Sequence, residues 1–111
     1  MLTEAIGPVL YKAVSASSSG DNTIVDAVDG KKIRVLGYVL VGAGAVNVFF
    51  QSAAAGDVIS GTMAIAGAGG TITAPPSGLG YFETDKGELL NLNLSSGVAV
   101  TGHLTYQLVK G

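Results

Sequence analysis

The chain contains one histidine and no cysteine, so few of its side chains could support acid–base, nucleophilic or metal chemistry. Any catalytic dyad that uses an imidazole must be built around His103, whose neighbours on the same face of an extended segment are Thr101 and Thr105. Threonine is a poor base and a poor orienting acid, and a zinc site here would need carboxylates as all its other ligands. We therefore expect His103 to be a surface or interface residue.

Two groups of acidic residues lie close together in the sequence. Asp21, Asp26 and Asp29 lack the alternating spacing and the bidentate Glu of a calcium loop. The acidic residues within 83–88 fall at a predicted turn, where we expect solvated side chains and not the facing carboxylate pair of a glycosidase. The glycine-rich residues 66–70 are followed by neither Lys-Ser nor Lys-Thr, as a phosphate loop requires. The sequence thus predicts no enzyme, no metal site and no cofactor.

Charge is scarce along the whole chain of 111 residues, which is long enough for a single domain. Six basic and eight acidic residues make up 13% of it, against about 25% in an average soluble domain. The basic residues are scattered, so the chain offers no electrostatic footprint for a phosphate backbone. These numbers predict a neutral surface and no nucleic-acid partner.

The most apolar stretch is IRVLGYVLVGAGAVNVFF, residues 33–50. A membrane-spanning helix needs about 20 predominantly apolar residues, and this stretch is shorter and is interrupted by Gly42-Ala43-Gly44. Its β-branched and aromatic content favours two strands around that turn, which we interpret as a hairpin. The N-terminal MLTEAIGPVLYKAV lacks the basic and apolar regions of a secretory signal, so we expect a mature, unexported chain without a membrane segment.

The first arm of this predicted hairpin, residues 32–41, is apolar on both faces. Strand alternation gives two sets of side chains: Val35, Val39 and Val41 on one face, and Leu36, Tyr38 and Leu40 on the other. A strand that is apolar on both faces needs two covers, and in a two-layer fold the second cover is most simply another subunit. The candidate subunit-interface residues are Leu36, Tyr38, Leu40, Phe49 and His103.

Turn residues and alternation divide the rest of the chain into short strands. Asp29-Gly30 is the preferred two-residue hairpin turn and is expected to join a strand at 23–28 to the one that starts at Lys31, with further turns at 85–87 and 95–97. The remaining expected strands are 9–14, 59–66, 71–74, 90–95 and 98–108. In 90–95 an apolar face alternates with a polar amide face, and in 98–108 one face is expected to be core and the other solvated. About eight strands without a helical pattern predict an all-β, eight-stranded, jelly-roll-like β-sandwich in one domain, with an immunoglobulin-like sandwich or a closed barrel as the alternatives.

Within this domain, residues 23–111 are expected to form the sandwich core. Residues 1–22 would supply an N-terminal strand or arm and a Ser/Gly-rich loop of the same domain. Residues 1–5 could form an arm that becomes ordered only on a partner.

The segments KIRVLGYVL, AVNVFFQS, SGTMAIAGAGG and GYFETDKGELLNLNLSSGVAVTGHLTY together resemble the small structural proteins encoded among the virion genes of tailed bacteriophages and prophages. The resemblance covers Lys31 to Tyr106, and its most specific part begins at Gly80-Tyr81-Phe82. It implies a virion component with a jelly-roll-like fold, often trimeric, that sits on the capsid as a decoration or cement protein or belongs to the tail or fibre. Such families have no catalytic residues to transfer.

These observations lead to a ranked set of functional hypotheses. The first is a capsid decoration protein that binds the capsid surface as a homotrimer, with the major capsid protein as its partner. It would be made in the host cytoplasm and located in the virion. The second is a tail- or fibre-associated module that contacts a receptor, and the third is a small carbohydrate-binding jelly roll.

Overall fold

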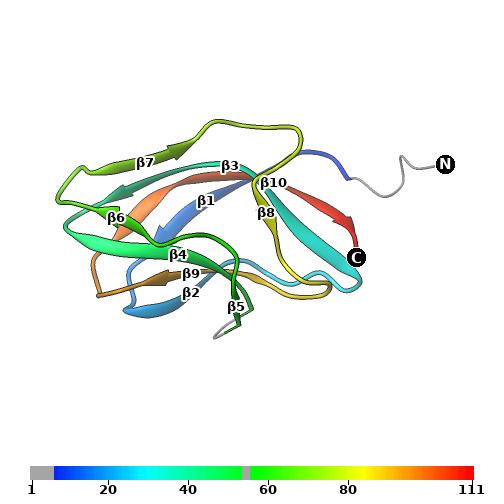
Figure 1. Ribbon diagram of the computed structural model, residues 1–111, viewed down its shortest axis with the longest axis horizontal. Helices are drawn as coiled ribbons and strands as arrows, with labels where there is room; N and C mark the ends of the chain where they lie inside the picture. The colour runs from blue at the N-terminus through cyan, green and yellow to red at the C-terminus, as the bar shows by residue number, and fades with distance from the viewer. Residues whose placement is uncertain (1–6, 54–55) are drawn as a thin grey trace.

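The computed structural model describes residues 7–53 and 56–111, and it shows an all-β chain (Figure 1). The described residues contain no helix, and so none that is long and apolar enough to cross a membrane. The N-terminal arm expected at residues 1–5 lies outside the described residues. The strands are β1 (Leu10–Ala16), β2 (Gly20–Val25), β3 (Lys31–Gly42), β4 (Val46–Ser52), β5 (Asp57–Val58), β6 (Met63–Ile65), β7 (Thr71–Ala74), β8 (Phe82–Glu83), β9 (Leu90–Leu94) and β10 (Val100–Lys110).

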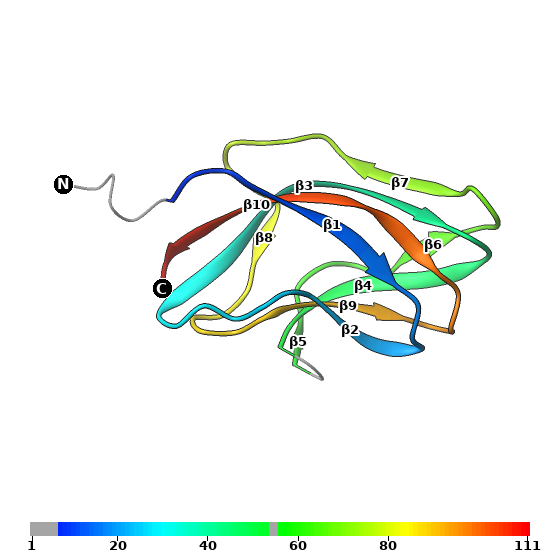
Figure 2. The same ribbon diagram turned by 180° about the vertical axis from the view of Figure 1, so that it is seen from behind.

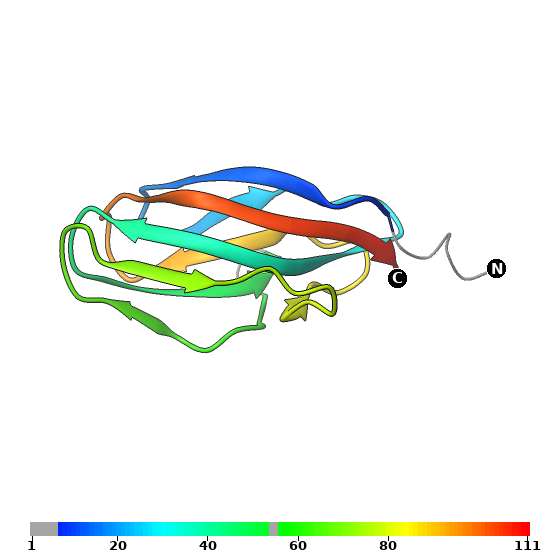
Figure 3. The ribbon, with the colours of Figure 1, turned by 90° about the horizontal axis from the view of Figure 1, so that it is seen from above.

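The strands form two antiparallel sheets, an arrangement compatible with a β-sandwich (Figures 1 and 2). Sheet A has the order β1-β10-β3-β7, with β8 also paired to β3. Sheet B has the order β2-β9-β4-β5, with β6 also paired to β4. Seen from above, β1, β10, β3 and β7 of sheet A lie side by side (Figure 3). The eight expected strands are present with altered bounds, and β5 and β8 are additional strands of two residues each.

The strand pairings are nested from the outside of the chain inward. β1 pairs with β10, β2 with β9, β3 with β7 and β4 with β6. The turns expected at 29–30 and 42–44 are present, but each joins a strand of one sheet to a strand of the other. The hairpin interpretations of residues 33–50 and of the two strands around Asp29-Gly30 were therefore both wrong. The same turn residues serve a connection between layers, because each strand buries its apolar face against the opposite sheet.

One core lies between the sheets, and both sheets contribute to it. Fully buried side chains include Leu40 and Leu104 from sheet A and Phe50 and Leu92 from sheet B. The apolar faces predicted within residues 90–95 and 98–108 are confirmed, since their apolar members all pack into or against this core: Leu90, Leu92, Leu94, Val98, Val100, Leu104, Tyr106 and Leu108. Burying a side chain of this size stabilises the fold by about 1.5–3 kcal/mol.

A β-bulge in β3 changes which residues share a face. Val35 pairs with Tyr106 and Gly37 with Thr105, so Leu36 is an extra residue without a partner in β10. An insertion of one residue moves all later side chains to the other face. Val35 consequently faces the core together with Tyr38 and Leu40, whereas Val39 and Val41 face outward. The predicted grouping of Val35 with Val39 and Val41 was wrong for this reason.

The N-terminal part of the described chain packs with the rest. Val14 and Ala16 of β1 are buried in the common core. The Ser/Gly-rich loop is reduced to residues 17–19, where the Ser18 amide donates to Asn22 Oδ1 and Asn22 Nδ2 donates to the Ser18 carbonyl. Asn22 thus closes a short turn that leads directly into β2.

Candidate interaction surface

The outer face of sheet A is a regular grid of uncharged side chains. The strand registers align three rows across it: Ser15–Thr101–Val41–Thr71, Ala13–His103–Val39–Thr73, and Tyr11–Thr105–Gly37. None of these residues carries a formal charge when histidine is counted as neutral. We call this grid the outer face. Covering a surface of this kind buries no charge, but the partner must supply hydrogen bonds to the hydroxyl groups that it covers.

Alternation explains why the outer face has no charge. Lys12 is the one charged residue of β1, and it lies between Tyr11 and Ala13, so it points to the opposite side of the sheet. In β10 the only charged residue is Lys110, at the far end of the strand, where it pairs with Lys31. On the outer side of sheet A, Lys32 and Arg34 of β3 and their partner Glu83 lie beyond the three rows, toward the same end as Lys31 and Lys110.

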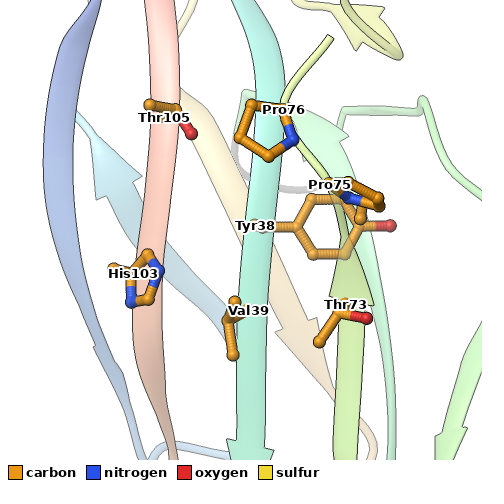
Figure 4. A pocket seen from close by; sticks show the side chains of 8 residues that line it. Tyr38, Val39, Thr73, Pro75, Pro76, His103 and Thr105 are labelled. Atoms are coloured by element: carbon orange, nitrogen blue, oxygen red, sulfur yellow. The ribbon is translucent and has the colours of Figure 1, made fainter.

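His103 lies in a shallow hollow of about 160 Å³ on the outer face, which we call the histidine hollow (Figure 4). His103 and Thr105 of β10 border it on one side and Thr73 of β7 on the other, with Val39 of β3 between them. Tyr38, Ala74 and two prolines complete the lining. No carboxylate or amine lines this hollow, so its imidazole has no acid or base partner for catalysis.

A second hollow of about 260 Å³ adjoins the first and shares Pro76 and Thr105 with it. We call it the Leu36 hollow. Its lining is Val9, Tyr11, Leu36, Pro76, Ser77, Gly78 and Thr105. Because hydroxyl groups are its only polar side-chain atoms, this hollow is suited to an apolar side chain.

Exposed apolar side chains are concentrated around the Leu36 hollow. Tyr11 is 77% exposed and Val9 is 45% exposed, and both line it. Leu79 is 88% exposed and Tyr81 is also exposed, and both belong to the loop that supplies Ser77 and Gly78 to the lining. The other large exposed apolar residues of the described chain, Val28 and Val58, lie outside both hollows.

The loop of residues 75–81 is fastened to β3 at several points. The Ser77 amide donates to the Leu36 carbonyl at 2.9 Å, and the Tyr81 amide donates to the Val35 carbonyl at 2.8 Å. The Tyr81 hydroxyl donates to the Pro75 carbonyl at 2.5 Å, which closes the loop on itself. Leu79 is therefore held on a loop of defined shape.

This loop also covers part of the apolar surface that the sequence assigned to a second subunit. Pro76 packs directly over Gly37, where an added Cβ would lie 3.0 Å from Pro76 backbone atoms. Leu36 is only 4% exposed, on the side of the sheet away from the core cluster. The chain itself thus provides one cover for β3 and leaves Val39 and Val41 partly open.

The five candidate interface residues occupy different places. Tyr38 and His103 line the histidine hollow, and Leu36 lines the adjoining one. Leu40 is fully buried in the core, so it can influence an interface only by supporting its neighbours. Phe49 lies between two fully buried residues of β4 and points away from the core on sheet B, so it is not part of the same surface.

Tyr38 links the outer face to an aromatic cluster at the edge of the core. Its ring centroid lies 5.2 Å from that of Phe50, and Phe50 lies 5.2 Å from Phe82. The hydroxyl of Tyr38 donates to Met63 Sδ at 3.3 Å. Burial raises the pKa of Tyr38 above its usual value of 10.0, and the nearby Tyr81 adds to the effect. Tyr38 is therefore a packing residue that stays neutral at physiological pH.

The acidic groups considered in the sequence form no metal site within the described residues. Glu83 binds Lys32 and Arg34, and Glu88 accepts a hydrogen bond of 2.6 Å from Ser52. Asp21 accepts a hydrogen bond from Asn93 on the outside of sheet B. These carboxylates are engaged in contacts within the fold.

Leu79 is a single leucine between two glycines and belongs to no periodic pattern in the sequence, so its exposure is apparent only in the fold. Comparisons with protein-family models, with curated proteins and with solved structures find no match for this chain.

Proposed function

We propose that this protein is a structural component that works by self-association and by covering the surface of a larger assembly. The observation that carries this proposal is the outer face, an uncharged grid on four strands next to a concentration of exposed apolar side chains. Patches of this kind mark protein–protein contacts in soluble proteins. The lack of an acid–base pair in either hollow gives catalysis no support.

We further propose that the two sheets form an eight-stranded jelly roll, to which β5 and β8 are short additions. The nested pairing supports this, because a jelly roll arises when a long antiparallel ribbon wraps around itself and pairs its first strand with its last. Connections that alternate between the sheets support it as well.

Within this class, the assembly we propose is a bacteriophage virion. The protein would be a capsid decoration protein that binds the major capsid protein as a homotrimer on the virion surface. This step rests on the sequence resemblance of residues 31–106 to phage structural proteins. An uncharged outer face is compatible with it, since a symmetric ring can cover the same patch on every subunit.

The test combines solution mass with location. Light scattering of the purified protein over a concentration series should give the mass of a trimer. Antibodies to the purified protein should then label capsids in electron micrographs of phage particles from the strain that carries the gene. Labelling of tails would replace decoration with the tail or fibre role, and absence of labelling would reject a virion role. A monomer at all concentrations would reject self-association.

A further inference from the structure

We propose that Leu79 of one copy inserts into the Leu36 hollow of a neighbouring copy, and that this contact joins the subunits. The inference rests on the proposed self-association and names the residues that carry it. The occupant of the hollow is a second copy of this chain.

The exposure of Leu79 is the first reason. At 88% it is the most exposed of the large apolar side chains in the described chain, although its loop is fixed to β3 by backbone hydrogen bonds. A leucine on a well-defined loop has already lost conformational entropy, so its burial by a partner has a smaller ordering cost. Its own loop supplies Pro76, Ser77 and Gly78 to the wall of the hollow, but Leu79 itself does not line it.

The hollow is the second reason. Its volume of about 260 Å³ exceeds by several times the space of about 30 Å³ that one water takes in the liquid, so it has room for a branched side chain. Val9, Tyr11 and Leu36 offer apolar walls, and no charge faces the space. A partner with charged residues at this point would bury a charge without a counter-charge, which is costly. A copy of the same chain presents an uncharged leucine loop and avoids that cost.

The positions of Leu79 and the Leu36 hollow also limit the symmetry of the proposed oligomer. Each subunit offers both elements, so the contact can be head-to-tail, with Leu79 of every subunit entering the next. Such a contact closes into a ring when the rotation between neighbours permits it. We expect closure with three copies, in agreement with the proposed trimer.

The first experiment removes the exposed side chain of Leu79 and keeps the rest of the chain. Leu79→Ser should raise the dissociation constant for self-association by about tenfold or more, as measured by sedimentation equilibrium. Val58→Ser is the matched control, because Val58 is 57% exposed on sheet B and lies outside the hollow. It should associate like the unmodified protein. A Leu79→Ser protein that associates normally would overturn the inference and leave the proposed self-association intact, whereas a monomeric unmodified protein would overturn both.

The second experiment tests the contact directly and uses the absence of cysteine in the chain. Two single variants, Leu79→Cys and Tyr11→Cys, are mixed under mild oxidation. Linked pairs containing one of each should form faster than pairs of either variant alone, and Val58→Cys should form few pairs with either. The double variant Tyr11→Cys/Leu79→Cys should give a covalent trimer on a non-reducing gel. Random pairing among all variants, or a ladder that stops at dimer, would contradict the head-to-tail ring.

Discussion

Glu83 holds two basic side chains at once, with its Oε2 3.3 Å from Lys32 Nζ and its Oε1 3.0 Å from Arg34 Nε. Burial by itself raises the pKa of this carboxyl. The hydrogen bonds from Arg34 and Lys32 and their positive charges act in the opposite direction and outweigh it, so the pKa lies below its usual value of 4.5. A lowered pKa in the folded state stabilises the fold above the unfolded-state pKa, and this stabilisation is lost as the pH falls through the folded-state pKa.

We therefore predict that Glu83→Gln lowers the free energy of unfolding near neutral pH by up to about 1 kcal/mol, because the pair is partly solvated. The difference from the unmodified protein should shrink as the pH is lowered below the usual carboxyl pKa of 4.5 and through the lower folded-state pKa. Urea unfolding at several pH values measures both. Asp57→Asn, at an exposed position of β5, serves as the control and should show a smaller effect. A loss from Glu83→Gln that is constant with pH would indicate a packing effect and not an ion pair.

Asn91 is a polar residue whose side chain is fully buried, although it lies on the outside of sheet B. Its Nδ2 donates to Gln51 Oε1 at 2.7 Å, but its Oδ1 has no hydrogen-bond partner among the residues that the structure describes. The alternation within residues 90–95 correctly places Asn91 on the polar face of β9, but at Asn91 this face is covered. Within the described residues, the hydrogen bond and the oxygen without a partner thus belong to one buried amide pair.

Removal of both partners should cost less than the two single removals added together. Gln51→Leu alone leaves the Asn91 amide without an acceptor and should cost about 1–3 kcal/mol in the free energy of unfolding. Asn91→Leu/Gln51→Leu should cost less than the sum of the single variants, since the unpaired oxygen disappears as well. A double-mutant cycle in urea gives the coupling. Strictly additive costs would show that the pair does not interact.

At the scale of the elements, the pairing of β10 with β3 requires a glycine at position 102. Gly102 has φ of 149°, and an added Cβ would lie 1.8 Å from the Val39 carbonyl oxygen. We predict that Gly102→Ala destabilises the fold by more than about 3 kcal/mol or prevents folding, because backbone atoms must separate. Gly67→Ala, where the added Cβ meets nothing within 4 Å, should stay within about 1 kcal/mol of the unmodified protein. Thermal unfolding followed by circular dichroism compares them, and equal melting temperatures would contradict the close approach.

The same elements show how far sequence reasoning reached. Alternation found the core positions of β9 and β10, because both strands run without interruption along one side of the core. It failed at Leu36, since a bulge leaves no mark in the order of apolar residues. Turn residues marked where the chain reverses, but Gly42-Ala43-Gly44 serves a hairpin and a crossing between layers equally well. The sheet of each strand depends on long-range pairing, which local patterns do not contain.

The sequence predicted only the part of the candidate surface that lies on β3, because the rest is formed by residues distant in the chain. The apolar excess of residues 32–41 pointed correctly to a face that needs a second cover. The cover over Leu36 is the loop containing Pro76, which is distant in the sequence. Leu79 has no apolar neighbour in the sequence, so its place beside the hollow could emerge only from the fold.

The whole molecule has two unlike ends. The connections at 17–19, 43–45, 66–70 and 95–99 meet at one end and contain only Ser, Gly, Ala and Val. The turns within 26–30 and 84–88 lie at the opposite end and carry Asp26, Asp29, Asp85, Lys86 and Glu88. The outer face extends from the uncharged end along sheet A. The position of the charges therefore separates a solvated end from surfaces that can be covered.

This separation predicts how self-association responds to salt. An interface formed by the outer face and the Leu36 hollow contains no charged pair. Screening by salt should therefore have little effect on the free energy of association. Raising NaCl from about 0.1 M to about 1 M shortens the Debye length from about 10 Å to about 3 Å. We expect the dissociation constant from sedimentation equilibrium to change by less than about twofold over this range, and sodium sulfate to strengthen association because it favours burial of apolar surface. If NaCl instead weakens association by tenfold or more, the charged end must form the contact. The turns within 26–30 and 84–88 would then replace the outer face as the surface through which the subunits meet.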